Sequence, residues 1–240
     1  MTSYSKTAVI TGAYGGLGKS LAKQYLDKGY DLCLIGRNKE KLVELSKSLR
    51  KTSHSAMIRI YDCDFGDNYW VKDVCERISM DFKQVDVLIN CAAVFPVSSM
   101  ENMSLKDFET CMQVNVVAPF VMMQQLLSSL KKSDNGKIIN IASSSAYGGG
   151  PNTSAYCASK HALLGLSRSL FKELRSEGIK VFCVSPGSIQ TDMGKEVEKL
   201  GQVYDTFMTP QEVSEYIYNA TSYDGHMISE EIRLNRVFVQ

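Results

Sequence analysis

The chain has 240 residues, of which 44% are hydrophobic and 22% are charged, and its formal net charge at pH 7 is +1. This length supports a large core, and no linker or charge block divides the chain, so we expect one domain over residues 1–240. The near-neutral charge and the lack of a basic stripe argue against a nucleic-acid partner. No apolar run approaches the ~20 residues of a membrane span, and no signal-peptide core precedes the first strand. We therefore expect a cytoplasmic protein without a membrane partner.

Seven cysteines are scattered along the chain without zinc-binding spacing. Several lie in apolar segments, so they are interpreted as small buried side chains of a protein in a reducing compartment. The three histidines, His54, His161 and His226, are too dispersed to suggest a metal site or a histidine-based triad. The sequence thus predicts no metal centre.

The first element is a short apolar strand over residues 6–10, followed by a glycine-rich turn and a helical run over 19–28. Strand, glycine turn and helix in this order are typical of a dinucleotide-binding unit. Gly12 permits the tight turn, Gly16 lets a pyrophosphate approach the backbone, and Gly18 lets the helix pack closely on the strand. The helix N-terminus directs amide hydrogens at the anion.

Further along, short apolar strands alternate with longer amphipathic helices, which predicts repeated β-α-β units and a parallel sheet with right-handed crossovers. The expected strands are 31–35, 56–61, 85–89, 137–142, 180–185 and 231–239. The expected helices are 39–51, 68–82, 104–132, 154–177 and 210–223.

Tyr156 and Lys160 lie four residues apart in the helix predicted over 154–177, so they share one helix face. An ammonium beside a phenol favours the phenolate, so we expect Lys160 to lower the pKa of Tyr156 toward the range useful for proton transfer. The spacing alone is weak, because ordinary amphipathic helices also contain it.

Several motifs in order give the chain a clear resemblance to the short-chain dehydrogenase/reductase family. They are the Thr-Gly-x-x-x-Gly-x-Gly turn from Thr11 to Gly18, Asn90 after the fourth strand, Asn115 in Val-Asn-Val, Ser143 thirteen residues before Tyr156, and the run from Pro186 to Thr191. The resemblance covers the whole chain. It implies an α/β fold with a Rossmann-like, doubly wound parallel sheet of about seven strands flanked by helices on both faces.

The resemblance also implies the catalytic residues Asn115, Ser143, Tyr156 and Lys160. Tyr156 would exchange a proton with a substrate oxygen, and Ser143 would hydrogen-bond that oxygen, although a strand-end serine also has a plain solvating role. Lys160 would in addition hold the nicotinamide ribose. Asn115, a poor helix former inside a helix, would support a water chain to the lysine, or would be merely a surface amide.

The cofactor choice depends on the end of the second strand. Gly36 stands where an NAD-preferring site places an acid, and Arg37 can bind a 2′-phosphate, so NADP(H) is favoured over NAD(H). Against this, many NADP-preferring relatives carry a basic residue where this chain has Gly15, and Arg37 also fits a solvated turn. Asp64 matches the residue that meets adenine, or it is a turn acid.

The predicted cofactor contacts combine these motifs. Cys91 and Ala93 depart from the usual Asn-Asn-Ala-Gly run, while Ile189 and Thr191 are expected to meet the nicotinamide carboxamide. The full set is Gly12, Tyr14, Gly16, Leu17, Gly18, Arg37, Asp64, Phe65, Asn90, Tyr156, Lys160, Pro186, Gly187, Ile189 and Thr191.

Residues 192–208 are predicted to form an apolar lid over the reacting carbonyl. Phe95, Val97, Tyr147 and Asn152 are candidates for the opposite wall, with ordinary packing as the alternative. A hydrophobic substrate portion is indicated, and sugars, acyl thioesters, steroids and small ketones all stay open.

The sequence predicts an NADP(H)-dependent enzyme that interconverts a carbonyl and a secondary alcohol. The alternative is a catalytically silent NADP(H)-sensing protein of the same fold, and epimerase or dehydratase chemistry fits the turn and chain length less well. Family members pair through the two long helices, so a homodimer or homotetramer is expected.

Overall fold

The computed structural model describes residues 5–52, 55–225 and 227–237. Their centre is a seven-stranded sheet, wholly parallel, in the order β3-β2-β1-β4-β5-β6-β7. The chain crosses from β3 back to β4 beside β1, and this reversal confirms the doubly wound α/β fold. The strands are β1 (Thr7–Thr11), β2 (Asp31–Gly36), β3 (Ile58–Asp62), β4 (Val87–Asn90), β5 (Lys137–Ile141), β6 (Lys180–Pro186) and β7 (Glu231–Leu234).

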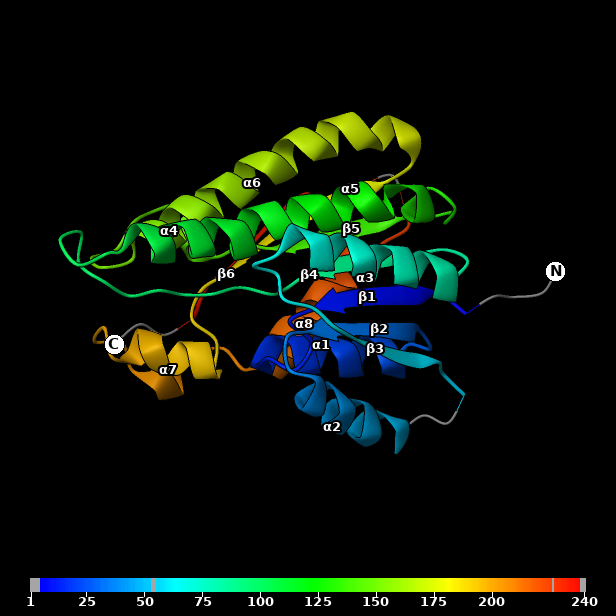
Figure 1. Ribbon diagram of the computed structural model, residues 1–240, viewed down its shortest axis with the longest axis horizontal. Coiled ribbons are helices and arrows are strands. Elements are labelled where there is room, and N and C mark those ends of the chain that lie inside the picture. Colours follow the sequence, from blue (N-terminus) through cyan, green and yellow to red (C-terminus); the bar gives the residue numbers. More distant parts are fainter. Residues whose placement is uncertain (1–4, 53–54, 226, 238–240) are drawn as a thin grey trace.

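Helices cover both faces of the sheet (Figure 1). One face carries α1 (Gly16–Asp27), α2 (Lys39–Arg50) and α8 (Pro210–Thr221). The other face carries α3 (Asn68–Asp81), α5 (Ala118–Leu130) and α6 (Ser154–Leu174). Several of these helices begin at a side-chain cap that accepts a backbone amide of the first turn, as the sequence pattern leads one to expect. The caps are Asn38 for α2, Asp67 for α3 and Thr209 for α8.

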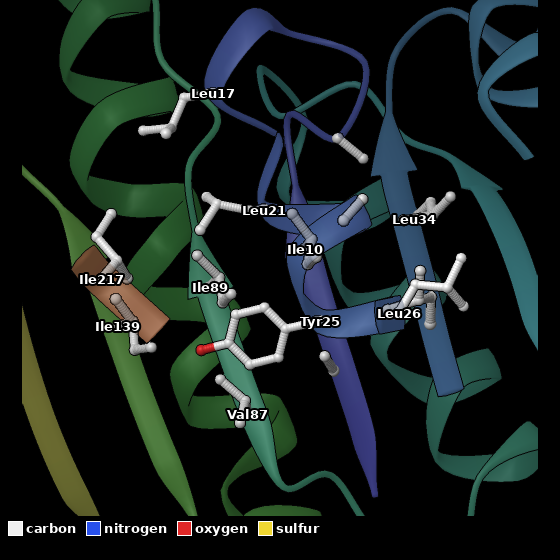
Figure 2. Packing of buried hydrophobic residues seen from close by; sticks show 14 of the residues in the cluster. Ile10, Leu17, Leu21, Tyr25, Leu26, Leu34, Val87, Ile89, Ile139 and Ile217 are labelled. Carbon is white, nitrogen blue, oxygen red and sulfur yellow. The ribbon is translucent and has the colours of Figure 1, made fainter. Parts of the chain in front are cut away.

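Alternation along the strands divides the core into two layers, because successive side chains point to opposite faces of a sheet. Ile10 of β1 packs with the α1, α2 and α8 side, whereas its neighbour Val9 packs with the α3 and α5 side. Figure 2 shows the first layer, where the Tyr25 ring lies against Val87, Ile89 and Ile139. With both faces covered, the central strands are fully buried.

The helix predicted over 104–132 is not one regular helix. It divides into α4 (Leu105–Met112), a π-helical segment (Gln113–Val117) and α5. The π segment contains Asn115, whose side chain hydrogen-bonds the backbone of Val94 in the loop after β4. That pairing accounts for the irregular turn, because single π turns inside α-helices occur where a functional side chain must be aimed.

Smaller differences lie at the ends of elements. α1 begins at Gly16, inside the glycine turn, and α6 ends at Leu174 with a 3-10 turn over Arg175–Glu177. β7 ends at Leu234, whereas the prediction extended to 239, of which 238 and 239 lie outside the described residues. The 192–208 segment contains a short helix, α7 (Asp192–Glu198), and a 3-10 turn (Tyr204–Thr206). In the described chain, no helix combines the length and hydropathy required to cross a bilayer.

Candidate active site

A cavity of about 960 Å³ lies at the carboxyl ends of the strands, with α7 on its far side. In Figure 1 the strand arrows point toward this end, and α7 lies beyond them at the left. Parallel strands expose loops and helix N-termini at this edge, which is where open α/β sheets bind ligands. The cavity wall brings together Gly12, Tyr14, Gly16, Leu17, Gly18, Arg37, Asp64, Phe65, Ser143, Tyr156, Lys160, Pro186, Gly187, Ile189 and Thr191.

The glycine turn has the geometry expected of an anion site. Gly12 has φ +65°, in the left-handed region, and a Cβ there would lie 2.8 Å from the Ala92 Cα. A Cβ on Gly18 would overlap the Gly12 carbonyl oxygen, so this glycine allows α1 to start tightly against the turn. α1 has no side-chain cap at Gly15, which leaves the first amides of the helix free for an anionic group.

The end of β2 is open and basic. A Cβ on Gly36 would come within 2.5 Å of the Tyr14 ring, so the tyrosine lies flat against the glycine. The Lys41 Nζ lies 5.7 Å from the centre of the same ring. Arg37 is exposed on the cavity wall. Two cations, Arg37 and Lys41, therefore lie near the end of β2.

Tyr156 is buried at the wall of the cavity, and its ring meets the edge of Phe95 with centroids 4.7 Å apart. Burial raises its pKa to about 12, and a hydrogen bond with the Ser143 side chain acts in the opposite direction. Ser143 follows the end of β5, and its Oγ also accepts the Ser145 amide at 3.1 Å. The structure thus places the predicted phenol and serine together.

Lys160 is 2% exposed, and its Nζ donates to the Ile141 carbonyl at 2.8 Å. Desolvation of the ammonium lowers its pKa to about 8. The Nζ lies 5.5 Å from the centre of the Tyr156 ring. Within one turn of α6, the chain buries both an acid and a base.

The expected lowering of the Tyr156 pKa by Lys160 is not what the surroundings of Tyr156 produce. The tyrosine pKa is raised, and the group that lowers it is Ser143. The physical reason is that burial penalises the phenolate, while the buried ammonium is itself destabilised and directed at a backbone carbonyl.

Asn115 and Asn90 do not line the cavity. The Asn115 amide accepts the Val94 N–H at 2.9 Å and donates to the Val94 carbonyl and to the Ser159 Oγ, both at 3.0 Å. Its side chain therefore fixes the loop after β4 to α6, and a part in a water chain stays a prediction. Asn90, predicted to contact the cofactor, is buried and donates to Asn140 at 2.8 Å. A direct contact between Asn90 and the cofactor therefore stays a prediction, because the Asn90 side chain does not line the cavity.

The loop between β6 and α7 packs against the glycine turn. Thr191 caps α7 by accepting the Gly194 amide at 3.1 Å, and its methyl group lies over Gly16, where a Cβ would come within 2.5 Å. Asp64 accepts the Gly66 amide at 2.9 Å, so it is a turn acid as well as a wall residue. Contacts of either residue with a cofactor stay predictions.

Of the residues predicted for the second wall, Phe95 and Asn152 line the cavity, while Val97 and Tyr147 do not. The Tyr147 hydroxyl instead donates to Glu231 of β7 at 2.9 Å. Sequence reasoning missed the residues whose hydrogen bonds hold the 192–208 segment in place. Gln202 accepts hydrogen bonds from Ser188 and from Arg236, contacts that span 14 and 34 positions and leave no local signal.

Comparison with known proteins agrees with this geometry. Residues 6–200 match the family profile described as short chain dehydrogenase. The chain belongs to the short-chain dehydrogenase/reductase family. It is 31% identical over 195 residues to the 3-oxoacyl-(acyl-carrier-protein) reductase FabG of Rickettsia bellii, covering 78% of this chain and 74% of that protein.

Solved structures share the fold. An alcohol dehydrogenase from the archaeon Thermococcus sibiricus, complexed with 5-hydroxy-NADP, superposes with a TM-score of 0.89 at 24% identity over 99% of each chain. A structure described as ElxO with NADP bound has a TM-score of 0.83 at 26% identity, covering 97% of this chain and 98% of that one. The oxidoreductase class and a nicotinamide dinucleotide follow for this family member.

Replacing Lys160 with Met should change the pH dependence of stability. Between pH 8 and 10.5 the unfolded lysine retains a proton that the folded one has released, so the wild-type free energy of unfolding rises with pH. Because the variant lacks this group, the difference wild type minus Lys160→Met should grow by about 2 kcal/mol from pH 7.5 to 9.5. Urea unfolding at both pH values measures it.

Lys172→Met is the matched control, since this lysine lies on the exposed side of the same helix. It should leave the wild-type pH dependence intact. Parallel curves for wild type and Lys160→Met would show that the buried ammonium does not titrate as described.

Proposed function

We propose that the protein is an NADP(H)-dependent oxidoreductase that interconverts a carbonyl and a secondary alcohol, with Tyr156 as the general acid and base. The observation that carries this proposal is that Tyr156, Ser143 and Lys160 lie close together in the cavity that the glycine turn also lines. A nicotinamide dinucleotide bound there would supply or accept the hydride. Side chains of this protein would bind the substrate, orient it and transfer the proton.

The electrostatics favour the reductive direction near neutral pH. With a pKa of about 12, Tyr156 stays protonated and holds the proton that a developing alkoxide needs. Ser143, joined to the phenol, is placed to hydrogen-bond the same oxygen as negative charge accumulates on it. Lys160 can return a proton to this site, because its own pKa of about 8 lies near the working range.

Arg37 and the absence of an acid at Gly36 support NADP(H). A guanidinium binds a phosphate with paired, charge-assisted hydrogen bonds, whereas a carboxylate at this position would repel it. In the described part of the chain Arg37 has no hydrogen bond or ion pair, so nothing competes for it. The NADP bound in ElxO, at 26% identity, agrees with this choice.

Tyr156→Phe should lower kcat/KM for ketone reduction by at least about hundredfold, because the proton donor is lost while the ring packing against Phe95 remains. NADPH binding should persist. Loss of NADPH absorbance with a panel of aldehydes and ketones measures the first, and fluorescence titration the second. Tyr147→Phe is the control, since its hydroxyl bonds Glu231 away from the cavity. Full activity of Tyr156→Phe would refute the assignment.

Arg37→Ala should weaken NADPH binding about tenfold or more, the expected cost of losing hydrogen bonds to a charged group, with NADH binding unchanged. Arg59→Ala serves as control, because this arginine is exposed on β3 and does not line the cavity. Titration of each variant with both cofactors, followed by fluorescence, gives the ratio. Equal weakening of NADPH and NADH would contradict a 2′-phosphate contact.

We also propose that the chain assembles as a homodimer or homotetramer through α4, α5 and α6. Exposed apolar side chains on the first two helices, Leu105, Phe108 and Phe120, would be buried by a second copy. Light scattering at micromolar concentration should give a multiple of the 26.7 kDa chain mass. Phe120→Glu, placed on the exposed face of α5, should shift the protein toward monomer, and a monomeric wild type would exclude this assembly.

A further inference from the structure

Resting on the proposed function, we infer that Gln202 recognises the substrate, by donating a hydrogen bond from its amide nitrogen to a second, uncharged oxygen of the carbonyl compound. Gln202 belongs to the segment after α7 and lines the same cavity as Tyr156. The inference names a substrate class: ketones that carry another carbonyl, hydroxyl or ether oxygen on the lid side.

The orientation of the Gln202 amide follows from its partners. Its Oε1 accepts the Ser188 hydroxyl at 2.8 Å and an Arg236 Nη2 at 3.1 Å. A hydroxyl can donate or accept, but a guanidinium has donors alone. In a flipped amide the NH2 group would face the arginine, and two hydrogen-bond donors would meet. Arg236 therefore fixes the orientation in which Oε1 faces Ser188 and Arg236 and the amide nitrogen points away from them.

Arg236 is itself held in place. Its Nη1 donates to the Thr206 hydroxyl at 2.8 Å, and its guanidinium lies 5.1 Å from the centre of the Phe207 ring. The C-terminal segment thereby contacts the 192–208 segment at Thr206 and Phe207 as well as at Gln202. Donation from a cation to Oε1 also polarises the amide, which makes its N–H groups better donors.

The Gln202 nitrogen has no hydrogen-bond partner within residues 5–52, 55–225 and 227–237. Three apolar residues of the same segment, Met193, Val197 and Leu200, also line the cavity. Gln202 is half-buried, so a ligand that displaces water from its amide leaves this donor unsatisfied unless the ligand itself offers an acceptor. The free donor therefore selects for an oxygen.

The lysines of this segment are paired with carboxylates, and the nearest other cation, Arg236, is directed at Gln202 Oε1 and Thr206, so a neutral oxygen is the partner proposed for the amide nitrogen. Lys199 lines the cavity but is paired with Glu196 at 2.7 Å, and Asp192 is paired with Lys195 at 3.0 Å. The lid thus offers one amide donor and no free cation among its described residues.

The test compares 2-hexanone with hexane-2,3-dione and hexane-2,5-dione, using NADPH as reductant. The measured quantity is the ratio of kcat/KM for each dione to that for 2-hexanone. Comparing this ratio between wild type and variant removes the difference in intrinsic reactivity between the ketones. Gln202→Leu should lower this ratio about 2- to 10-fold for the better dione, mainly through KM, because a neutral hydrogen bond is lost equally from substrate and transition state.

Gln202→Glu separates recognition from anchoring of the lid. A carboxylate still accepts from Ser188 and Arg236 but has no N–H to donate, so the dione preference should fall as in Gln202→Leu. Gln211→Leu, a surface glutamine of α8 paired with Glu215, should keep the wild-type ratio. Preference retained in Gln202→Glu would overturn the inference and leave anchoring as the role of Gln202.

The outcomes separate a failure of the Gln202 assignment from a failure of the proposed oxidoreductase function. Reduction of all three ketones with one ratio in wild type and every variant would overturn the role of Gln202 while the proposed function stands. Failure of the wild type to reduce any ketone with NADPH, despite binding it, would contradict the proposed function and the inference together.

Discussion

The hydrogen bond from the buried Lys160 ammonium to the Ile141 carbonyl is the contact on which the site depends. It joins α6 to the end of β5, two residues before Ser143, and so brings phenol, hydroxyl and ammonium to one wall of the cavity. An ammonium with so little exposure is tolerated where a strand end supplies a carbonyl oxygen for it. The edge of a parallel sheet provides such a group at every strand.

Burial then sets the chemistry of the pair. The phenol of Tyr156 becomes harder to ionise and the ammonium of Lys160 easier to deprotonate, so each is driven toward its neutral form. This arrangement is consistent with the proposed role of Tyr156 as a proton donor to a developing alkoxide. The same low polarity strengthens the hydrogen bond between Tyr156 and Ser143, which orients the donor.

The two ends of the cavity are built by different means. At the glycine turn, backbone amides at the start of α1 and the Arg37 side chain give this end of the cavity a positive potential. At the other end, Gln202 is held by hydrogen bonds from Ser188 and from Arg236 of the C-terminal segment. The glycine-turn end of the cavity is thus built from local motifs, whereas the end near Gln202 depends on contacts between distant parts of the chain.

The alternation of strands and helices, the glycine turn and the shared helix face of Tyr156 and Lys160 were predictable from local periodicity and short spacing, whereas Ser143 was predicted from the family resemblance. The π turn around Asn115, the burial that raises the Tyr156 pKa, the turning of Tyr147 toward Glu231 and the lid contacts of Gln202 were not. These depend on which side chains meet across the fold and how much water is excluded when they do. Pattern along the chain therefore decided the fold and indicated which side chains we propose to react, while packing decided the shifts in their pKa and which side chains line the cavity.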